Sequence, residues 1–209
     1  MNETSKAVVR RLFDSRFANR YFIGDGIDIG SGPDPLGQYG MQFPLMSTMK
    51  NWDLMDGDGQ YLESLEDECK HFVHSSHCLE HMVDPKVALI NWIRVLKPGG
   101  HLVVTIPEED MYEQGQFPST YNDDHKWTFT IHKKASWSKK SINLITLLTS
   151  KEFSDIEIIK VEKIDHTYRW HLPRMDQTAY TSAEAAIEFI ARKLTKEEIK
   201  RKGLYKDQV

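Results

Sequence analysis

The segment Gly26-Ile27-Asp28-Ile29-Gly30-Ser31-Gly32 decides the predicted fold, because an apolar strand-like run ends there in a pair of glycines. A strand that ends in Gly-x-Gly lets the backbone approach a ligand at a point where any Cβ would intrude. At the end of such a strand, the carboxylate of Asp28 can bind a cation or an amino group. Asp53 follows about 20 residues later, the separation at which the second strand of a nucleotide-binding unit presents an acid to a ribose. The segment therefore predicts a cofactor site.

The residues after Gly32 argue against a dinucleotide cofactor. The dinucleotide fingerprint requires a third glycine where this chain has Pro35, and a helix that begins at the pyrophosphate. The stretch 33–40 is too rich in proline and glycine for a regular helix, so the first crossover is expected to be short or a loop. S-adenosylmethionine has a ribose and an adenine but no phosphate, and its sulfonium and amino groups suit an acidic lining. The sequence supplies that lining in Asp28, Asp53, Asp56 and Asp58.

The bulk composition predicts one domain in a reducing compartment. The chain has 209 residues, of which 40% are hydrophobic, which is enough for a single domain with a substantial core. Its formal net charge of -4 gives no overall electrostatic attraction for nucleic acid or an anionic membrane, so neither is an expected partner. Cys69 and Cys78 cannot form a disulfide framework, and no apolar run reaches the roughly 20 residues of a membrane span. We expect a cytoplasmic protein, and the sequence does not indicate its oligomeric state.

Hydrophobic periodicity predicts alternating strands and helices along the chain. Strands are expected at 46–53, 71–75, 101–106 and 156–164, and helices at 4–19, 85–96 and 139–148. We expect a single domain over 1–209, with a cofactor-binding core at 23–107, an acceptor-side insert at 108–137 and a C-terminal helix-strand-helix part at 138–209. The insert lies beyond the carboxyl end of a strand, where open α/β sheets bind ligands.

Four motifs in sequence order resemble those of class I S-adenosylmethionine-dependent methyltransferases, in particular the type 11 methyltransferase domain. Residues 26–32 resemble the first motif of that family, and Asp53 resembles the acid at the end of its second strand. Residues 72–81, Phe-Val-His-Ser-Ser-His-Cys-Leu-Glu-His, resemble the fourth-strand motif, and residues 94–100, Arg-Val-Leu-Lys-Pro-Gly-Gly, resemble the turn before the fifth strand. The resemblance implies an α/β, Rossmann-like sheet of seven mostly parallel strands with an insert after the fifth. It also implies methyl transfer from S-adenosylmethionine, with S-adenosylhomocysteine as product.

The same resemblance implies roles for the residues of the cofactor site. Gly30 and Gly32 would pass beneath the methionine part, with Asp28 near its amino group, and Asp53 would accept hydrogen bonds from both ribose hydroxyls. Asp58 and the amide of the next residue would contact adenine, although Asp-Gly-Asp-Gly at 56–59 is equally typical of a plain turn. The expected site is completed by Ser31, Leu54, Gly59, Ser76 and His77.

The insert supplies the candidate catalytic group for an alcohol acceptor. The segment 121–129 combines acids, an imidazole and aromatic rings. His125 is expected to accept the hydroxyl proton, with Asp123 or Asp124 fixing its tautomer. The alternative is that His125 is a loop histidine that caps backbone groups. His81 is either a buried structural histidine or part of the active-site wall.

The insert also suggests the class of acceptor. Its residues 110–127 resemble inserts in bacterial methyltransferases of capsule, O-antigen or other glycan assembly. That resemblance implies a sugar hydroxyl, such as one on a nucleotide-linked sugar, with aromatic rings stacking on the sugar and basic side chains near a phosphate. The expected substrate-binding residues are Tyr112, Tyr121, Lys126, Trp127 and Arg169. Packing of the insert onto the sheet is the alternative role for its aromatic rings.

Two questions stay open at the level of sequence. His77, Glu80 and His81 lie close enough in sequence for a metal site, but their order differs from the H-E-x-x-H motif, and we expect no metal. Besides an O-methyltransferase, the residues allow an N-methyltransferase for a small amine or a cofactor-binding module without activity. A dehydrogenase is a more distant alternative.

Overall fold

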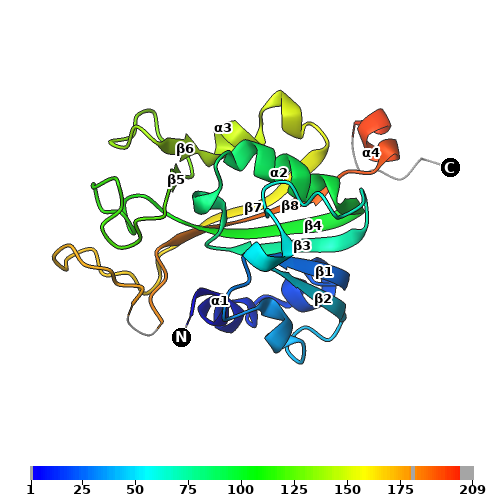
Figure 1. Ribbon diagram of the computed structural model, residues 1–209, viewed down its shortest axis with the longest axis horizontal. Coiled ribbons are helices and arrows are strands. Elements are labelled where there is room, and N and C mark those ends of the chain that lie inside the picture. The colour runs from blue at the N-terminus through cyan, green and yellow to red at the C-terminus, as the bar shows by residue number, and fades with distance from the viewer. Residues whose placement is uncertain (1, 180–181, 203–209) are drawn as a thin grey trace.

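A six-stranded sheet forms the centre of the molecule (Figure 1). The computed structural model describes residues 2–179 and 182–202. The sheet order is β2-β1-β3-β4-β8-β7, and only β8 runs against its neighbours. The strands are β1 Gly24–Ile29, β2 Met46–Trp52, β3 Lys70–Ser76, β4 Leu96–Pro107, β7 Ile156–Ile164 and β8 Ala186–Lys193, with the separate pair β5 Thr128–Thr130 and β6 Ser141–Asn143.

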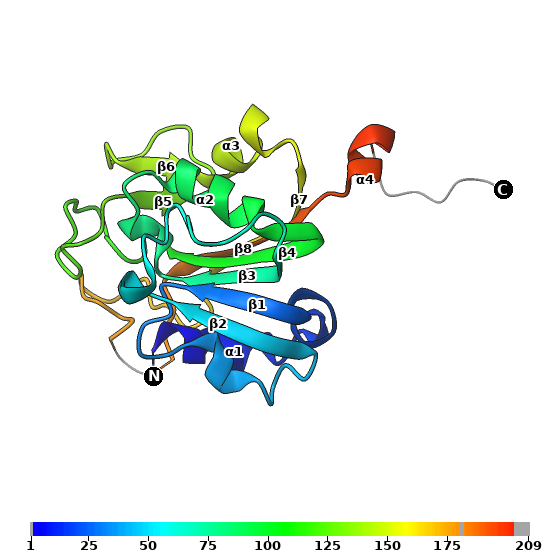
Figure 2. The ribbon, with the colours of Figure 1, turned by 45° about the vertical axis from the view of Figure 1, so that its right-hand side comes forward.

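Helices cover both faces of this sheet. Figures 1 and 2 show α2 and α3 on one face and α1 on the other. The α-helices are α1 Glu3–Arg11, α2 Pro85–Arg94, α3 Leu144–Leu148 and α4 Lys196–Arg201. Shorter turns are the π-helix Phe17–Tyr21 and the 3-10 helices Leu36–Tyr39, Leu54–Asp56, Leu79–His81 and Lys151–Phe153. None of the described helices is long and apolar enough to cross a membrane.

The side chains of each strand point alternately toward the two helix-covered faces of the sheet. Ile27 and Ile29 of β1 pack into one apolar core together with Trp92 of α2. Phe72 of β3 packs on the opposite face with Phe22, which follows the π-helix. Both cores are fully buried, so the register of β1 and β3 is well determined.

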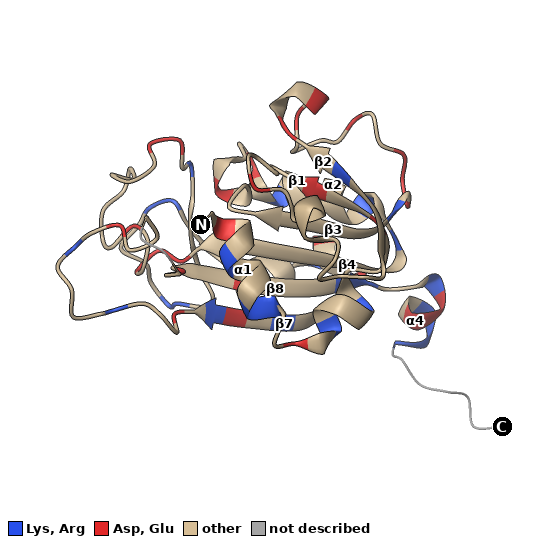
Figure 3. Cartoon of the chain, turned by 90° about the horizontal axis from the view of Figure 1, so that it is seen from below, with Lys and Arg blue, Asp and Glu red and all other residues tan. Residues whose placement is uncertain are grey.

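A buried polar network attaches α1 to the second face of the sheet. Figure 3, in which the backbone is blue at Lys and Arg and red at Asp and Glu, shows α1 lying against the sheet beside β8. The Nε of Arg11 lies 2.9 Å from Glu188 Oε2 in β8, and its Nη1 lies 3.0 Å from His74 Nε2 in β3. Because an arginine can only donate, His74 accepts at Nε2 and carries its proton on Nδ1. Nδ1 of His74 therefore donates to Asp28 Oδ1 at 2.6 Å. On the other side of the network, Arg10 Nη1 lies 3.0 Å from Glu188 Oε1. The network joins α1, β1, β3 and β8.

The predicted α/β, mostly parallel architecture is confirmed, but the expected count of seven strands is wrong for the described residues. Residues 53–69, which separate β2 from β3, contain turns and no strand. A parallel crossover takes about a dozen residues, so this stretch is too short for a further strand with two crossovers. As expected, the crossover between β1 and β2 contains only the 3-10 helix Leu36–Tyr39.

Several predicted elements differ in extent. The expected helix 4–19 ends at Arg11, because the chain turns at Asp14, whose carboxylate accepts from the amide of Arg16. The expected helix 139–148 begins only at Leu144, since residues 141–143 pair with β5 instead. β8 was not predicted, and residues 203–209 of the expected C-terminal part lie outside the described residues.

Gly26 allows β1 and β3 to approach each other closely, which gives a stability prediction. A Cβ on Gly26 would overlap the Phe72 ring. We expect Gly26→Ala to lower the free energy of unfolding by about 1–3 kcal/mol, the usual cost of overpacking a core. Chemical denaturation measures the change, and Gly40→Ala is the control because a Cβ there would meet its nearest atom at 3.6 Å. Equal stability of the two variants would contradict this account of the β1–β3 contact.

Candidate active site

A pocket of about 730 Å³ lies at the carboxyl ends of β1, β2 and β3. Gly30 follows β1, Asp53 follows β2 and His77 follows β3, so three neighbouring strands each contribute to its wall. Its volume is in the range of small-molecule sites, about 300–1,000 Å³. The lining residues are Gly30, Gly32, Asp53, Leu54, Gly57, Asp58, Gly59, Gln60, His77, Cys78, His81, Met82, Val83, Asp124 and Lys126.

The glycine turn after β1 shapes the floor of this pocket. Gly30 has a φ of 70° and Gly32 a φ of 51°, a backbone region that disfavours side chains. A Cβ on Gly30 would lie 2.6 Å from the Cβ of Cys78, whereas a Cβ on Gly32 would meet no protein atom within 4 Å. The Gly32 position therefore faces open space in which a ligand can lie against the backbone.

Asp53 is oriented by the same turn. Its Oδ2 accepts from the amide of Gly32 at 3.1 Å, and its Oδ1 accepts from the amide of Leu54 at 2.9 Å. Its side chain remains exposed at the pocket wall. Asp58 also lines the pocket and accepts from the amide of Gln60 at 2.8 Å, so the turn role and a ligand role are compatible.

Three residues predicted for the cofactor do not line the pocket. Asp28 is buried, and its oxygens are used by the amide of Leu36 at 2.7 Å and by His74 Nδ1, which corrects its expected place beside an amino group. Ser31 is buried beneath the glycine turn. Ser76 is half-buried, and its hydroxyl oxygen is buried with no hydrogen-bond partner in the part of the chain that the structure describes.

The two candidate catalytic histidines occupy different depths. His81 lines the pocket, and Asp124 Oδ2 lies 3.0 Å from its Nδ1. His125 is buried behind His81, with ring centroids 4.9 Å apart. Its Nδ1 lies 2.7 Å from Glu113 Oε1, so Glu113 orients it and the expected partners Asp123 and Asp124 do not. The carboxylate–imidazole pairs are therefore His81 with Asp124 and His125 with Glu113.

Glu80 lies between these histidines. Its side chain is 0% exposed, and neither carboxylate oxygen has a hydrogen-bond partner among the described residues. Oε1 lies 3.9 Å from His81 Nε2 and 3.8 Å from His125 Nε2. Burial raises the pKa of Glu80 to about 7. The pKa of His81 is lowered, mainly by burial and next by the nearby His125. The site thus holds a carboxyl group that burial strongly disfavours as a free anion.

The predicted substrate-binding residues separate into two groups. Lys126 lines the pocket, where its Nζ donates to the His81 carbonyl at 2.7 Å. The Tyr112 ring lies 5.2 Å from the His125 ring and 5.9 Å from the Tyr121 ring, behind the pocket wall. Trp127 is a correction, because its indole donates to the Met82 carbonyl at 3.0 Å and its ring packs against the core.

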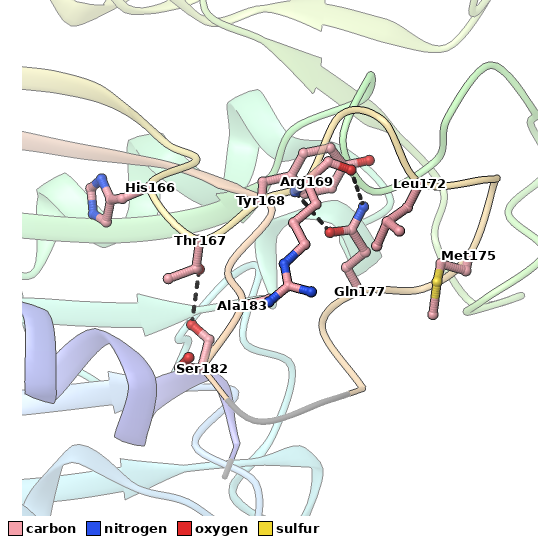
Figure 4. Close-up of a pocket in the computed structure, with 9 residues that line it drawn as sticks. All are labelled: His166, Thr167, Tyr168, Arg169, Leu172, Met175, Gln177, Ser182 and Ala183. Carbon is pink, nitrogen blue, oxygen red and sulfur yellow. Dashed lines mark hydrogen bonds between the residues drawn. The ribbon is translucent and has the colours of Figure 1, made fainter.

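Arg169 is also a correction, because it lines a different cavity, of about 590 Å³ (Figure 4). This cavity is built by a second insert between β7 and β8, at 165–185, which the sequence did not reveal as an element. Gln177 holds the backbone of Arg169 with two hydrogen bonds: its Oε1 accepts from the Arg169 amide at 2.9 Å, and its Nε2 donates to the Arg169 carbonyl at 3.0 Å. Figure 4 shows the guanidinium extending toward Ala183 and Ser182.

Sequence reasoning missed several lining residues and one orienting residue. Gly57, Gln60, Cys78, Met82 and Val83 adjoin the recognised motifs, so their proximity to those motifs is the signal that could have found them. Glu113 carries no such signal. It reaches His125 through an insert that has no periodic pattern, so only the folded chain brings the two together.

Comparisons with known proteins agree with this geometry. Residues 42–104 match the family model described as a methyltransferase domain. An S-adenosylmethionine-dependent methyltransferase from Archaeoglobus fulgidus superposes with a TM-score of 0.56 at 18% identity, over 91% of this chain and 94% of that one. The plantazolicin methyltransferase BpumL, solved with S-adenosylhomocysteine, superposes with a TM-score of 0.56 at 13% identity, over 91% and 84%. The chain has a methyltransferase domain and the class I methyltransferase fold.

S-adenosylmethionine is the cofactor that the matched methyltransferase domain and this fold imply. No curated protein matches the sequence. The [4+2]-cyclase SpnF also superposes, with a TM-score of 0.51 at 14% identity over 91% of this chain and 81% of that one. A shared fold therefore does not determine the reaction or the acceptor, which have to be argued from the residues of the site.

The pocket of the methyltransferase fits this cofactor. The exposed Asp53 carboxylate suits a ribose diol, Asp58 suits an adenine amine, and the bare backbone at Gly32 leaves room for the methionine part. When bound, S-adenosylmethionine supplies a methyl group on a positively charged sulfur. The acidic side chains around the pocket are compatible with that charge.

Asp53 gives a direct prediction for cofactor affinity. We expect Asp53→Ala to weaken S-adenosylhomocysteine binding about 10- to 100-fold, since a hydrogen bond to a charged group contributes about 1.5–3 kcal/mol. Titration calorimetry measures the dissociation constant. Asp56→Ala is the matched control, because Asp56 caps the same turn at 3.0 Å from the Asp53 amide but does not line the pocket. A similar loss in both variants would mean that the turn, not the ribose contact, determines affinity.

Proposed function

We propose that this methyltransferase methylates a hydroxyl group of a small polar acceptor. The observation that carries the proposal is the pocket wall formed by His81, which is oriented by Asp124 and backed by Glu80 and His125. An alcohol is a weak nucleophile until it loses its proton, so its methylation benefits from groups that take up or stabilise that charge change. A neutral amine is a stronger nucleophile than an alcohol and needs no strong base.

The residues of the wall define what the chain would do in the reaction. The bound cofactor would supply the methyl group, and the wall would hold the acceptor hydroxyl and take up the proton that it loses on methylation. His81 would face the hydroxyl, with Asp124 holding the imidazole in place through Nδ1. His125 is too deeply buried to contact the acceptor directly, so its proposed role is to position His81 and Glu80. Alignment and exclusion of water by the pocket contribute the rest.

A sugar, and most simply a nucleotide-linked sugar of capsular or other surface polysaccharide synthesis, is the acceptor that we propose. The resemblance of the insert to those of glycan methyltransferases supports it, as does the presence of Lys126 at the pocket. A lysine there suits a phosphate of the acceptor. The free thiols Cys69 and Cys78 are compatible with a cytoplasmic location, where such activated sugars are soluble substrates.

Transfer of a labelled methyl group tests the proposed function. The full chain would be incubated with labelled S-adenosylmethionine and separate panels of nucleotide sugars, amines and phosphorylated alcohols, and the products read by mass. We expect label on hydroxyl compounds, with nucleotide sugars the best acceptors. Label on amines alone would overturn the proposal in favour of an N-methyltransferase. Binding of S-adenosylhomocysteine without label on any compound would favour a module without activity.

A further inference from the structure

Three side chains converge on one point behind the wall of the cofactor pocket. Glu80, His81 and His125 each offer one potential ligand atom, and these atoms all lie within 4.8 Å of one another. Glu80 is fully buried, and within residues 2–179 and 182–202 both of its oxygens lack a hydrogen-bond partner. A buried carboxylate without hydrogen-bond partners costs free energy, so the position of Glu80 among three imidazoles, including that of His77 at 3.6 Å, calls for a physical explanation.

The outer partners of the two histidines supply part of that explanation. Each imidazole uses Nδ1 for a second carboxylate, Asp124 at 3.0 Å from His81 and Glu113 at 2.7 Å from His125. Each Nε2 then faces Glu80, at 3.9 and 3.8 Å, too far for a hydrogen bond. A carboxylate on one ring nitrogen that leaves the other nitrogen free as a ligand is the arrangement found around protein-bound metal ions.

The balance of charge around Glu80 points the same way. Among the described residues, no lysine or arginine forms an ion pair with Glu80 or with Glu113. The ion pair of Lys126 is with Asp124, at 3.4 Å. The buried carboxylates of this cluster thus face imidazoles and one another, and a cation at the shared point would neutralise them.

We propose that Glu80, His81 and His125 bind one divalent transition-metal ion, of which Zn²⁺ is the simplest. Two imidazoles and one carboxylate are a ligand set that such ions accept, with at least one further position left open. With bonds of about 2.0–2.1 Å, tetrahedral ligand atoms lie about 3.3–3.4 Å apart. The present separations of 3.8 and 3.9 Å to Glu80 would therefore close by about half an ångström.

The ion would deepen the proposed function, and in this respect the inference rests on that function. His81 belongs both to the pocket wall and to the cluster, so the open position of the ion would face the pocket. A divalent cation at the wall lowers the pKa of a hydroxyl group that reaches it, and the proton can then leave to solvent. The binding of the ion itself needs neither acceptor nor cofactor.

Metal binding is tested on the full chain without cofactor or acceptor. The protein would be stripped with a chelator and titrated with Zn²⁺ by calorimetry, and its metal content measured by plasma mass spectrometry. We expect one ion per chain, and at least a 100-fold loss of affinity in Glu80→Gln and in His125→Gln. Replacement by Co²⁺ should give visible absorption bands of a low-coordinate nitrogen and oxygen site, which the same variants lose.

Two further variants keep the test decisive. His132→Gln changes an exposed histidine outside the cluster and should bind Zn²⁺ as the wild type does. Glu113→Gln removes only the outer partner of His125 and should weaken Zn²⁺ binding about 10- to 100-fold. It serves as the test if Glu80→Gln or His125→Gln does not fold. Absence of stoichiometric binding, or equal affinity in wild type, Glu80→Gln and Glu113→Gln, would overturn the proposal. Label transfer to an acceptor is measured separately, so failure of the metal site and failure of the proposed function remain distinguishable.

Discussion

Replacement of His81 by glutamine is expected to lower methyl transfer to a hydroxyl acceptor by about 10²- to 10⁴-fold, the usual contribution of a positioned proton-transfer group. His81 is the member of the histidine cluster that lines the pocket, and Asp124 orients it from the opposite ring nitrogen. Glutamine retains much of the side-chain volume but offers no imidazole nitrogen. Single-turnover measurements with labelled S-adenosylmethionine separate the chemical step from cofactor binding.

The control for this prediction is His132→Gln, which removes an exposed imidazole outside the pocket. We expect its turnover to stay within a factor of about two of the wild type, within the small effects usual for surface substitutions. Affinity of His81→Gln for S-adenosylhomocysteine should change far less than its turnover, because the ribose contact is assigned to Asp53. Unchanged turnover of His81→Gln on a hydroxyl acceptor would contradict the role that we propose for His81 in the reaction.

Glu188→Gln is expected to lower the free energy of unfolding by about 3–5 kcal/mol, the cost of leaving a buried ion pair with one partner. Glu188 and Arg11 are both 0% exposed and 2.9 Å apart, and Arg10 approaches the other oxygen at 3.0 Å. Removal of the carboxylate leaves two guanidinium groups close together under the sheet. Urea denaturation measures the loss. Glu157→Gln is the control, because the Glu157 side chain is 46% exposed and its partner Arg192 keeps Glu198 at 2.8 Å, so its loss should cost about 0–1 kcal/mol.

The same network predicts a pH dependence of stability. The neighbouring Arg11 and Arg10 hold the pKa of Glu188 well below its ordinary value of 4.5, despite the opposing effect of burial. A carboxyl group whose pKa is lower in the folded state contributes stability above the unfolded value and loses it as the pH falls below that value. The wild type should therefore lose stability more steeply than Glu188→Gln below pH about 4.5. Parallel curves for the two proteins would contradict the assignment.

The cofactor half of the site could be predicted because its determinants are local in sequence. Gly30, Gly32 and Asp53 each follow a strand that the hydrophobic pattern indicates, and parallel strands bring their carboxyl ends to one edge. Asp28 was misassigned for a different reason. Its partners His74 and Leu36 are determined by how α1 and the following loop pack under the sheet, and no spacing in the sequence encodes that contact.

The acceptor half could be predicted only in outline. The insert after β4 was recognised as the source of His125, but its path is set by packing and not by periodicity, so the pairing of His125 with Glu113 was not foreseen. Trp127 was assigned to substrate because aromatic rings in a loop are compatible with a sugar, yet its indole bonds to the Met82 carbonyl and supports the insert. That the sheet has six strands and not seven could have been inferred from the few residues, 53–69, that separate β2 from β3.

The central claim is that the pocket beside Gly32 and Asp53 holds S-adenosylmethionine and not a phosphate-bearing dinucleotide. Thermal unfolding of the full chain with S-adenosylhomocysteine or with a nicotinamide dinucleotide tests it most directly. At about 100 times its dissociation constant, a ligand adds about 2.7 kcal/mol, or roughly 5–10 °C in melting temperature for a chain of this size. We predict that rise with S-adenosylhomocysteine and no rise with the dinucleotide. A rise with the dinucleotide alone would contradict the account.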